Sequence, residues 1–454
     1  MEREQMKKIK KFFGLGLLVP LSGIALVACG TPNNQTPSKE KEGATQDQGT
    51  GFSQPAVDKL AQDNKAKIET TAQDNNKHFK TNFALVTADG TVFDGSFNQS
   101  SFEAIKKFVS LTKDNAKQRH IDFATANLSQ TYTSLLVTEA NVWVLSGFQH
   151  GNAIETWLKQ GNNLESFKTK NIIIIGIDWA QATDSSIPNG RMISIQYNVE
   201  EGAWIAGYAA ADFLAAKYPN DENKRKLTSF GGGDFPAVTD FIVGFLTGVK
   251  AYNEENASKK TKVSSSTIDL TTGFNASAAE SVTKISSISN AGDPTIIFPA
   301  AGPQTQNVLN AIKGKSDKYV IGVDVDQSKT FKGAGESEKF FTSVEKGLGT
   351  SIFQVATALF TKENESKLLG GFQFNSKNGV VKLGYHDLFT NVSPNALTGD
   401  DKTLAEASIK KAVDKFKQLT NSKESEVKTT LKIKTATPGQ GSTILSELIQ
   451  EINK

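Results

Sequence analysis

Short apolar runs alternate with helix-forming stretches along the chain from residue 83 onward. The apolar runs suit buried strands, which we expect at 83–87, 120–124, 142–145, 172–177, 192–197, 226–231, 261–269, 295–298, 319–323, 340–343 and 380–382. Apolar residues at helical spacing predict helices at 102–112, 131–139, 154–160, 200–214, 238–253, 276–289, 305–313, 348–360 and 404–419. Strands separated by amphipathic helices are typical of α/β folds, with parallel sheets covered on both faces. The length favours two such sheets over one.

The N-terminal residues follow a different pattern. Basic residues at 7–11 precede an apolar run over 12–28, which Pro20 interrupts and which is short for a membrane span. A basic start followed by a short apolar core is typical of a secretory signal. Translation starts at Met1 or at Met6, and the later start leaves a more basic leader.

The apolar run ends at the single cysteine of the chain, Cys29. The preceding Leu26-Val27-Ala28 makes the junction resemble the bacterial lipobox, in which the cysteine is diacylated and the signal is cut just before it. We therefore expect a signal peptide at 1–28, a lipid anchor on Cys29 and a disordered polar tether over 29–57. An ordinary buried thiol is the alternative for Cys29, and residues 58–78 form either a helix or more linker.

Charge and residue counts exclude several classes of partner. Residues 1–28 hold five of the 51 basic and two of the 48 acidic residues, so the remainder is neutral overall. A neutral chain gives no general electrostatic basis for binding nucleic acid. One cysteine excludes an intramolecular disulfide and a Cys-based zinc site, and none of the four histidines is paired at metal-ligand spacing. We expect no nucleic acid, no metal and no cofactor.

The stretch from Phe83 to Phe102 combines a strand, a polar turn and a helix start. In α/β proteins, free N–H groups and loop side chains converge at such a turn and can hold a small ligand. Ser96 is the expected helix cap, and Phe97 beside Asn98 sets an aromatic face next to an amide. This pair suits a flat ligand that forms hydrogen bonds. The alternative is that Phe97 only packs inward at the helix start.

Other expected strands end in residues that suit ligand binding. Asp178 follows an apolar strand, Phe274 stands before an asparagine, Gly302 lets backbone approach a ligand, and Asp324 and Lys346 follow two further strands. Aromatic faces, carboxylates and a cation at sheet edges suit a purine nucleoside, with its rings between the aromatic faces. Asp178 would then serve the base, and Asp324 and Lys346 the ribose.

Two motifs allow other interpretations. Asp324-Val325-Asp326 has the spacing with which glycosyltransferases hold a divalent metal and a sugar nucleotide. A carboxylate at a strand end can also accept hydrogen bonds from two sugar hydroxyls. We prefer this second interpretation. Gly231-Gly232-Gly233 lacks the Lys-Ser/Thr of a phosphate loop and predicts a tight turn. The small residues of 200–213 predict close helix packing rather than a ligand site.

Several longer stretches resemble the basic membrane protein family, lipoproteins that include the purine nucleoside receptor of an ABC transporter. In the family's order they are SFNQS at 96–100, SGFQ at 146–149, EEGAWIAGYAAA at 200–211, FGGGDFPAVTDFIVGFLTGV at 230–249, IIFPAAG at 296–302, YVIGVDVDQS at 319–328 and TSVEKG at 342–347. The matches extend over residues 83–389, and the long ones are specific.

The resemblance implies a two-lobed fold of the periplasmic-binding-protein type I, with the ligand at the hinge between two α/β lobes. We expect a first lobe at 83–195, completed by part of 325–375, and a second lobe at 196–324, completed by part of 376–420. Residues 421–454 are then a polar C-terminal extension.

The resemblance also implies a ligand-binding set. By position, the stacking aromatics fall on Phe97 and Phe274, the base-binding carboxylate on Asp178, the sugar pocket on Gly302, Asp324 and Lys346, and a further contact on Asn98. Two departures affect selectivity. Ala88 replaces an acid of the family, with Asp89 one position later as its substitute, and Ala276 replaces a second common acid.

These observations favour a lipid-anchored solute-binding protein, and not an enzyme. It is expected as a monomer on the outer face of the cell membrane, where it captures nucleosides, most simply purine nucleosides, for the permease of an ABC importer. One alternative is a surface adhesin or antigen with a degenerate pocket, in which Ala88 and Ala276 mark the decay. Another is an enzyme that acts on nucleosides or glycans through Asp324 and Asp326.

Overall fold

The computed structural model describes residues 54–454 except 89–90, 94–96, 123–126, 183, 332, 334, 421–425 and 435–438. The expected signal peptide, the anchor at Cys29, the helix cap Ser96 and the substitute acid Asp89 lie outside the described residues. Both sheets of the fold lie in one unit that runs from Phe52 to Lys454.

The first lobe is built on a six-stranded parallel sheet with the order β11-β5-β4-β3-β1-β2. Its strands are β1 (Thr81–Thr87), β2 (Ala116–Ile121), β3 (Val142–Ser146), β4 (Ile173–Ile177), β5 (Met192–Tyr197) and β11 (Gly379–Leu383). Successive residues of a strand point to opposite faces, so Phe83 and Leu85 enter one core and Ala84 and Val86 enter another.

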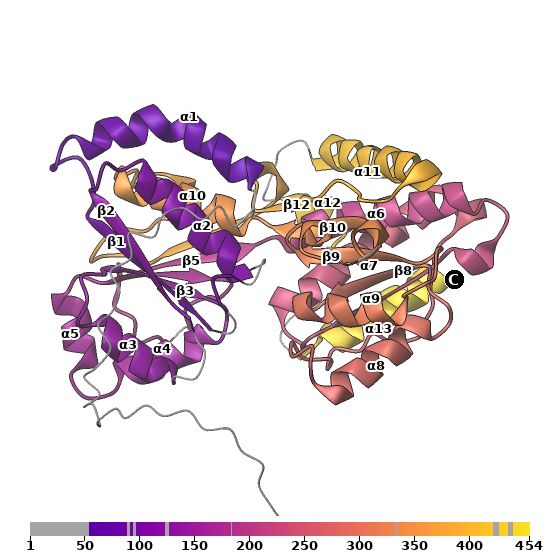
Figure 1. The fold of residues 1–454 in the computed structure, drawn as a ribbon, viewed down its shortest axis with the longest axis horizontal. Helices are drawn as coiled ribbons and strands as arrows, with labels where there is room; N and C mark the ends of the chain where they lie inside the picture. Colours follow the sequence, from indigo (N-terminus) through magenta and orange to yellow (C-terminus); the bar gives the residue numbers. More distant parts are fainter. Residues whose placement is uncertain are drawn as a thin grey trace, which may run out of the picture. The chain divides into compact units, whose positions relative to one another are not determined.

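Helices cover both faces of this first sheet (Figure 1). One face carries α1 (Pro55–Ala72), α2 (Phe97–Ser110) and α10 (Leu348–Phe360), and the other carries α3 (Leu128–Leu135), α4 (His150–Leu158) and α5 (Asn163–Thr169). The segment 58–78 is therefore largely helical. Because α1 begins at Pro55, the last residues of the expected tether are helical as well.

The second lobe repeats this architecture with the sheet order β12-β10-β9-β8-β6-β7. Its strands are β6 (Lys226–Gly231), β7 (Lys262–Val263), β8 (Ile296–Ala300), β9 (Tyr319–Asp324), β10 (Phe340–Lys346) and β12 (Thr390–Val392). Only β12 runs antiparallel to its neighbour. The strand expected at 261–269 is thus much shorter, and the rest of that segment is a loop.

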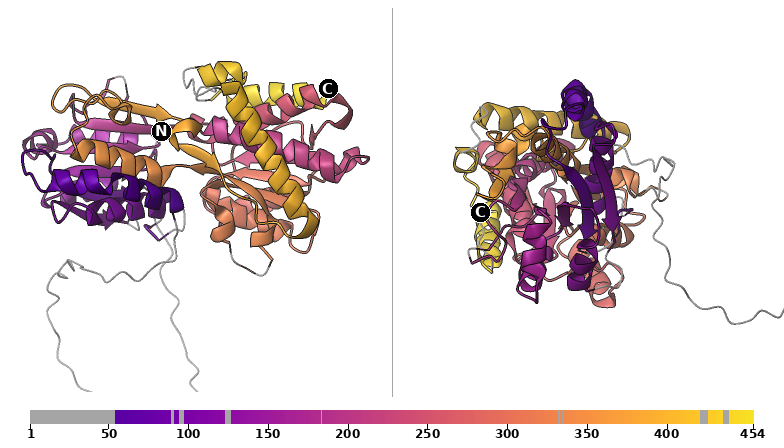
Figure 2. Two further views of the ribbon diagram at one scale, coloured as in Figure 1. Left: turned by 90° about the horizontal axis from the view of Figure 1, so that it is seen from above. Right: turned by 90° about the vertical axis from the view of Figure 1, so that its left-hand side faces the viewer.

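The second sheet also lies between two helical layers (Figures 1 and 2). The helices are α6 (Val199–Lys217), α7 (Pro236–Glu255), α8 (Ala279–Asn290), α9 (Thr305–Ala311), α11 (Gly399–Thr420), α12 (Val427–Thr430) and α13 (Gly441–Asn453). One layer is α8 and α9, the other is α6 and α7. Outside that second layer, α11 packs on α6, and α13 packs on α7. The expected α/β fold with two helix-covered sheets is confirmed.

Close contact between α6 and α7 confirms the packing interpretation of the small residues. A Cβ atom on Gly207 would lie 1.9 Å from the carbonyl oxygen of Phe245, and one on Gly244 would lie 2.3 Å from that of Glu200. Glycine at these two positions lets the helix backbones approach each other. The start of α6 is thereby held firmly beside the start of α7.

The chain passes between the lobes three times. It crosses from β5 to α6 at Asn198, from β10 to α10 at Gly347, and from β11 to β12 through residues 384–389. The ends of β5, β10 and β11 therefore form the hinge region. No helix of the described part of the chain is both long enough and apolar enough to span a membrane.

The C-terminal segment, expected as a polar extension, is packed onto the second lobe. Helix α13 buries Leu445, Leu448, Ile449 and Ile452. The side chain of Asn453 accepts a hydrogen bond from the N–H of Val263 at 2.8 Å and donates one to its carbonyl at 3.0 Å. The helix thus covers the outer edge of strand β7, which explains why a chain end rich in charge is ordered.

Candidate functional site

Lys346 is the central charged residue between the lobes. It ends strand β10, and its side chain is only 5% exposed. Its Nζ lies 2.7 Å from Oδ2 of Asp178 in the first lobe and 3.6 Å from Oδ1 of Asp324 in the second. Burial acts to lower the pKa of Lys346, but the two carboxylates outweigh it and hold the pKa above its ordinary value. The charged ammonium therefore joins an acid from each lobe.

Asp178 and Asp324 occupy equivalent positions in the two lobes. Each comes at the end of the third strand in its sheet order, with φ of +69° at Asp178 and +67° at Asp324. This left-handed conformation is uncommon outside glycine and tends to occur at functional sites. It turns the chain sharply at the point where each strand ends, so both carboxylates reach Lys346.

Asp324 has one carboxylate oxygen, Oδ1, whose partner among the described residues is the 3.6 Å ion pair with Lys346 and not a hydrogen bond. Its Oδ1 is buried, and within the described part of the chain it accepts no hydrogen bond. A buried acceptor without a donor is costly, which makes this atom available to a ligand hydroxyl. Gly302 lies beside it, since a Cβ there would lie 3.6 Å from Oδ2 of Asp324. The side chain of Gln327 holds Gly302 in place by donating to its carbonyl at 3.0 Å.

Phe97 and Asn98 begin helix α2. The ring of Phe97 is partly buried against the main core, and Nζ of Lys346 lies 5.7 Å from its centroid. This distance suits a cation–π contact, so one face of the ring belongs to the charged cluster. Asn98 is buried at the next position. Phe97 thus packs inward in part and also borders the cluster.

Phe274 lies in the second lobe, in the loop between β7 and α8. Its ring packs on the backbone of Gly232, where a Cβ would lie 2.5 Å from it, and its centroid is 6.2 Å from that of Phe235. The ring of Phe235 lies in turn 4.6 Å from that of Phe148, which belongs to the first lobe. The three rings therefore form a row that passes from one lobe to the other.

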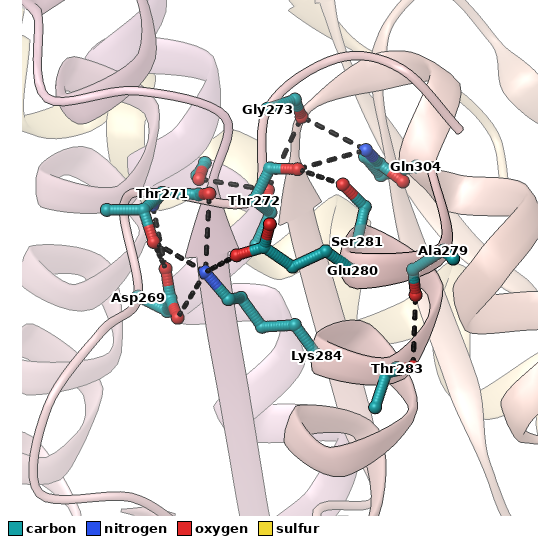
Figure 3. A network of polar contacts seen from close by, with 11 residues as sticks. Asp269, Thr271, Thr272, Gly273, Ala279, Glu280, Ser281, Thr283, Lys284 and Gln304 are labelled. Carbon is teal, nitrogen blue, oxygen red and sulfur yellow. Dashed lines mark hydrogen bonds and ion pairs between the residues drawn. The ribbon is translucent and has the colours of Figure 1, made fainter. Parts of the chain in front are cut away.

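A polar network fixes the loop that carries Phe274 (Figure 3). The side chain of Gln304 donates to the carbonyls of Thr272 at 3.2 Å and Gly273 at 3.1 Å, and Ser281 donates to Thr272 at 2.8 Å. Lys284 donates to the hydroxyl of Thr271 at 2.8 Å. Because Gln304 follows Gly302 by two residues, this network links the loop of Phe274 to the turn beside Asp324.

A cavity of about 370 Å³ opens between the lobes next to this charged cluster. The residues that line it come from both lobes and from the crossing segments: Phe148, Asp178, Trp179, Ala180, Gln196, Tyr197, Val199, Phe235, Pro236, Ala237, Asp240, Lys346 and Lys382. Its size and its mixture of aromatic walls with a few polar groups are typical of small-molecule sites.

The expected site residues fall into two groups. Asp178, Lys346, Asp324, Phe97 and Gly302 are brought together by direct contacts. Phe274 does not touch this group: within the described residues its ring contacts that of Phe235 and not that of Phe97.

The second acid of the expected metal motif has local partners. Asp326 accepts a hydrogen bond from the hydroxyl of Ser328 at 2.6 Å and lies 3.1 Å from Nζ of Lys329. Among the residues that the structure describes, no three His, Cys, Asp or Glu side chains are grouped so that they could hold a metal ion.

Comparison with known proteins decides the family. The model of the Bmp family, described as "ABC transporter substrate-binding protein PnrA-like", matches residues 81–429. The chain belongs to the Bmp family. Bmp proteins are solute-binding components of ABC transporters and not enzymes. The match covers both sheets and every expected ligand-contact residue, from Asp89 to Lys346.

Curated relatives agree with the Bmp assignment. Basic membrane protein B of Borreliella burgdorferi is 29% identical over 298 residues, which cover 65% of this chain and 78% of the relative. The ABC transporter nucleoside-binding protein BmpA of Lactococcus lactis is 27% identical over 318 residues, which cover 66% of this chain and 80% of the relative.

A solved structure shows the same fold as this Bmp chain. The ABC transporter solute-binding protein of Aeropyrum pernix aligns with a TM-score of 0.52 and 17% identity, over 82% of this chain and 91% of that one. The expected two-lobed fold of the periplasmic-binding-protein type is confirmed.

Sequence reasoning missed several residues of this candidate site. Phe148 and Phe235 lie within the SGFQ and GGGDFP stretches, where the aromatic type beside a glycine turn was an available signal. Gln304 and Gln327 hold the loops, and Asp240 lies inside helix α7, where it is one polar residue among several. Only the meeting of the lobes places these residues at one site.

Proposed function

We propose that this Bmp-family protein binds a nucleoside between its lobes and delivers it to the permease of an ABC importer. The base lies between the rings of Phe97 and Phe274 with Asp178 near its polar edge, and the ribose lies against Asp324 and Lys346. The buried Oδ1 of Asp324, which lacks a donor among the described residues, is the observation that carries the proposal. The name of the Lactococcus relative gives independent support for the ligand class.

The chemistry of the cluster favours a ligand rich in donors. One ammonium faces two carboxylates, so the cluster has an excess of negative charge. Neighbouring sugar hydroxyls can donate to Asp324 and accept from Lys346, which satisfies both residues at once. Gly302 leaves room for a sugar beside the carboxylate because it has no side chain.

The location of the protein is part of the proposal. The lipobox-like junction at Cys29 supports a diacyl anchor that holds a monomer on the outer face of the cell membrane. The polar segment after it then serves as a tether. A Cys29→Ser substitution should prevent acylation at this position and leave the signal uncleaved, which the mass of the protein checks; an unchanged mass of the lipid-bearing protein would overturn the anchor.

Calorimetry tests the ligand class. Full-length protein with Cys29→Ser, unfolded and refolded to remove bound ligand, is titrated with adenosine, guanosine and uridine. We expect a Kd in the micromolar range or tighter, equivalent to about −8 kcal/mol. Tighter binding of the two purine nucleosides supports purine preference. The absence of heat with every nucleoside, from protein that has refolded, overturns the proposal.

Phe97→Ala tests the stacking role. Loss of the ring should weaken nucleoside binding by about 1–3 kcal/mol, by analogy with stacking of bases on aromatic side chains. Phe93→Ala is the matched control because Phe93 is 64% exposed in the same connection. Equal affinities for Phe97→Ala and the control would remove Phe97 from the site.

A further inference from the structure

Asp240 is a buried acid in the cavity to which neither the sequence motifs nor the charged cluster assigns a role. It lies one turn into helix α7, is 6% exposed, and lines the cavity between the lobes. Within the described part of the chain it forms neither a hydrogen bond nor an ion pair. Because no described residue bonds to it, the carboxyl on the cavity wall is open to a partner that enters the cavity.

The surroundings of Asp240 suit the flat edge of a heterocycle. Phe235 and Phe148 are in ring contact at the cavity, and Trp179 lines its wall. The other acid of the cavity, Asp178, already accepts a hydrogen bond from Lys346 at 2.7 Å. Asp240 is therefore the acid of the cavity whose hydrogen-bonding capacity is unused by the described residues.

We propose that Asp240 is a specificity residue of the ligand site, whose carboxyl forms hydrogen bonds with the polar edge of the bound base. This inference rests on the proposed nucleoside function and adds the residue that reads the base.

The protonation of Asp240 gives the inference a distinctive signature. Burial raises its pKa to about 7, and Glu200 adds to this effect. The charged groups that face it from other elements are Glu200 on α6, Lys428 on α12, Lys382 on β11 and Asp178 after β4. Lys428 and Glu200 neutralise each other, since their charged atoms lie 2.6 Å apart. Below neutral pH the carboxyl can donate a hydrogen bond, and above it the carboxylate can only accept.

Two ligands separate these states. Adenosine has an amino group next to a ring nitrogen. The amino group can donate a hydrogen bond to the carboxylate, and the ring nitrogen can accept one from the protonated carboxyl. Purine riboside lacks the amino group, so its edge offers acceptors only. Purine riboside requires the protonated form of Asp240, and the fraction of that form falls as the pH rises through 7. We therefore expect the affinity for purine riboside to fall about tenfold between pH 6 and pH 8. The affinity for adenosine should change much less.

The experiment measures both affinities by calorimetry at pH 6, 7 and 8 on full-length protein with Cys29→Ser. Asp240→Asn should abolish the pH dependence for purine riboside, because the amide always offers a donor. Glu254→Gln is the matched control: it removes an exposed carboxylate from the same helix and should leave the pH dependence intact. Thermal unfolding of each variant shows whether it is folded.

The outcomes distinguish this inference from the proposed function. If the unsubstituted protein binds adenosine but its affinity for purine riboside is constant from pH 6 to pH 8, the role of Asp240 is wrong and the nucleoside function stands. The same conclusion follows if folded Asp240→Asn retains the pH dependence. If the unsubstituted protein binds no nucleoside at any pH, the proposed function itself fails, and the inference fails with it.

Discussion

The two lobes have matching strand orders, but residues at matching positions form different contacts. Position by position, the order β11-β5-β4-β3-β1-β2 corresponds to β12-β10-β9-β8-β6-β7, and in both sheets the third strand leads into an aspartate with left-handed backbone. Asp178 in the first lobe is paired with Lys346 at 2.7 Å. Its counterpart Asp324 lies 3.6 Å from the same ammonium and keeps one oxygen without a hydrogen bond from the described residues.

This difference predicts that Asp178 contributes more to the stability of the protein than Asp324 does. Topology alone places an acid at the end of each third strand, so the position does not decide what the acid does. The decision depends on Lys346, which belongs to the second sheet but pairs more closely with the acid of the first. The contact between the lobes is therefore closer through Asp178 than through Asp324.

The strongest test removes the shared cation. Lys346→Met leaves two carboxylates facing each other in a buried place, and we expect the free energy of unfolding to fall by about 3–5 kcal/mol, as for other broken buried pairs. Urea unfolding measures this loss. Combining Lys346→Met with Asp178→Asn should recover part of it, because one unpaired charge is then removed. A loss below about 1 kcal/mol would show that the ammonium does not join the lobes.

The two acids can be compared directly as single asparagine variants. Asp324→Asn should weaken nucleoside binding by about 1.5–3 kcal/mol, the range for hydrogen bonds to charged groups, with little change in the free energy of unfolding. Asp178→Asn should lower the free energy of unfolding as well, because it removes the closer partner of Lys346. Calorimetry and urea unfolding on both variants check this. Equal changes in stability would erase the distinction between the lobes.

Acid should affect the lobes in opposite directions. In the first lobe, burial lowers the pKa of His150 to about 3. Its Nε2 lies 3.1 Å from the carbonyl oxygen of Val86, and its Nδ1 lies 2.6 Å from the hydroxyl of Tyr132. The unfolded chain binds more protons at this group between pH 6.5 and about 3, so its contribution to stability falls as the pH falls. In the second lobe, burial raises the pKa of Glu201 to about 7. That contribution is present at acidic pH and is lost as the pH rises to 7.

Each contribution changes by about 1.4 kcal/mol per pH unit within its range. Urea unfolding of His150→Gln and Glu201→Gln between pH 5 and pH 7.5 measures them. The first variant should lose less stability on acidification than the parent protein, and the second should lose more. A parallel pH dependence of all three proteins would contradict both assignments.

The smallest expected effect concerns the aromatic contact between the lobes. Phe148 of the first lobe is 41% exposed, yet its ring lies 4.6 Å from that of Phe235 in the second. Such a ring pair contributes about 0.5–1.5 kcal/mol beyond burial. Phe148→Ala should shift the protein toward an open arrangement of the lobes, which small-angle X-ray scattering detects as a larger radius of gyration. Val137→Ala, at an exposed position of the same lobe, should leave it unchanged.

The sequence predicted the α/β architecture well because buried strands and amphipathic helices have strong periodic signals. The expected helix at 348–360 matches α10, and the strands at 192–197 and 226–231 match β5 and β6. Weak signals gave errors. The long strand expected at 261–269 is reduced to two residues, since α13 covers the edge of β7 and the rest of the segment forms the loop of Phe274.

The candidate site was predicted unevenly for a physical reason. Asp178, Asp324 and Lys346 stand directly after apolar strands, and parallel strands bring their ends to one edge, so a local pattern placed them near the site. Asp240 and Phe148 give no such signal, since one lies inside a helix and the other follows a turn. Their position at the site depends on how the two lobes meet, and no local pattern in the sequence predicts that arrangement.

The late position of strand β11 has a consequence for biogenesis. The first sheet begins at residue 81 but is not complete until Gly379–Leu383, far along a chain of 454 residues, has been synthesised. At a ribosomal rate of roughly 5–20 residues per second, the nascent lobe lacks an edge strand for many seconds. Until then β5 is an edge strand, and the backbone N–H and C=O groups along that edge lack their partners in the sheet.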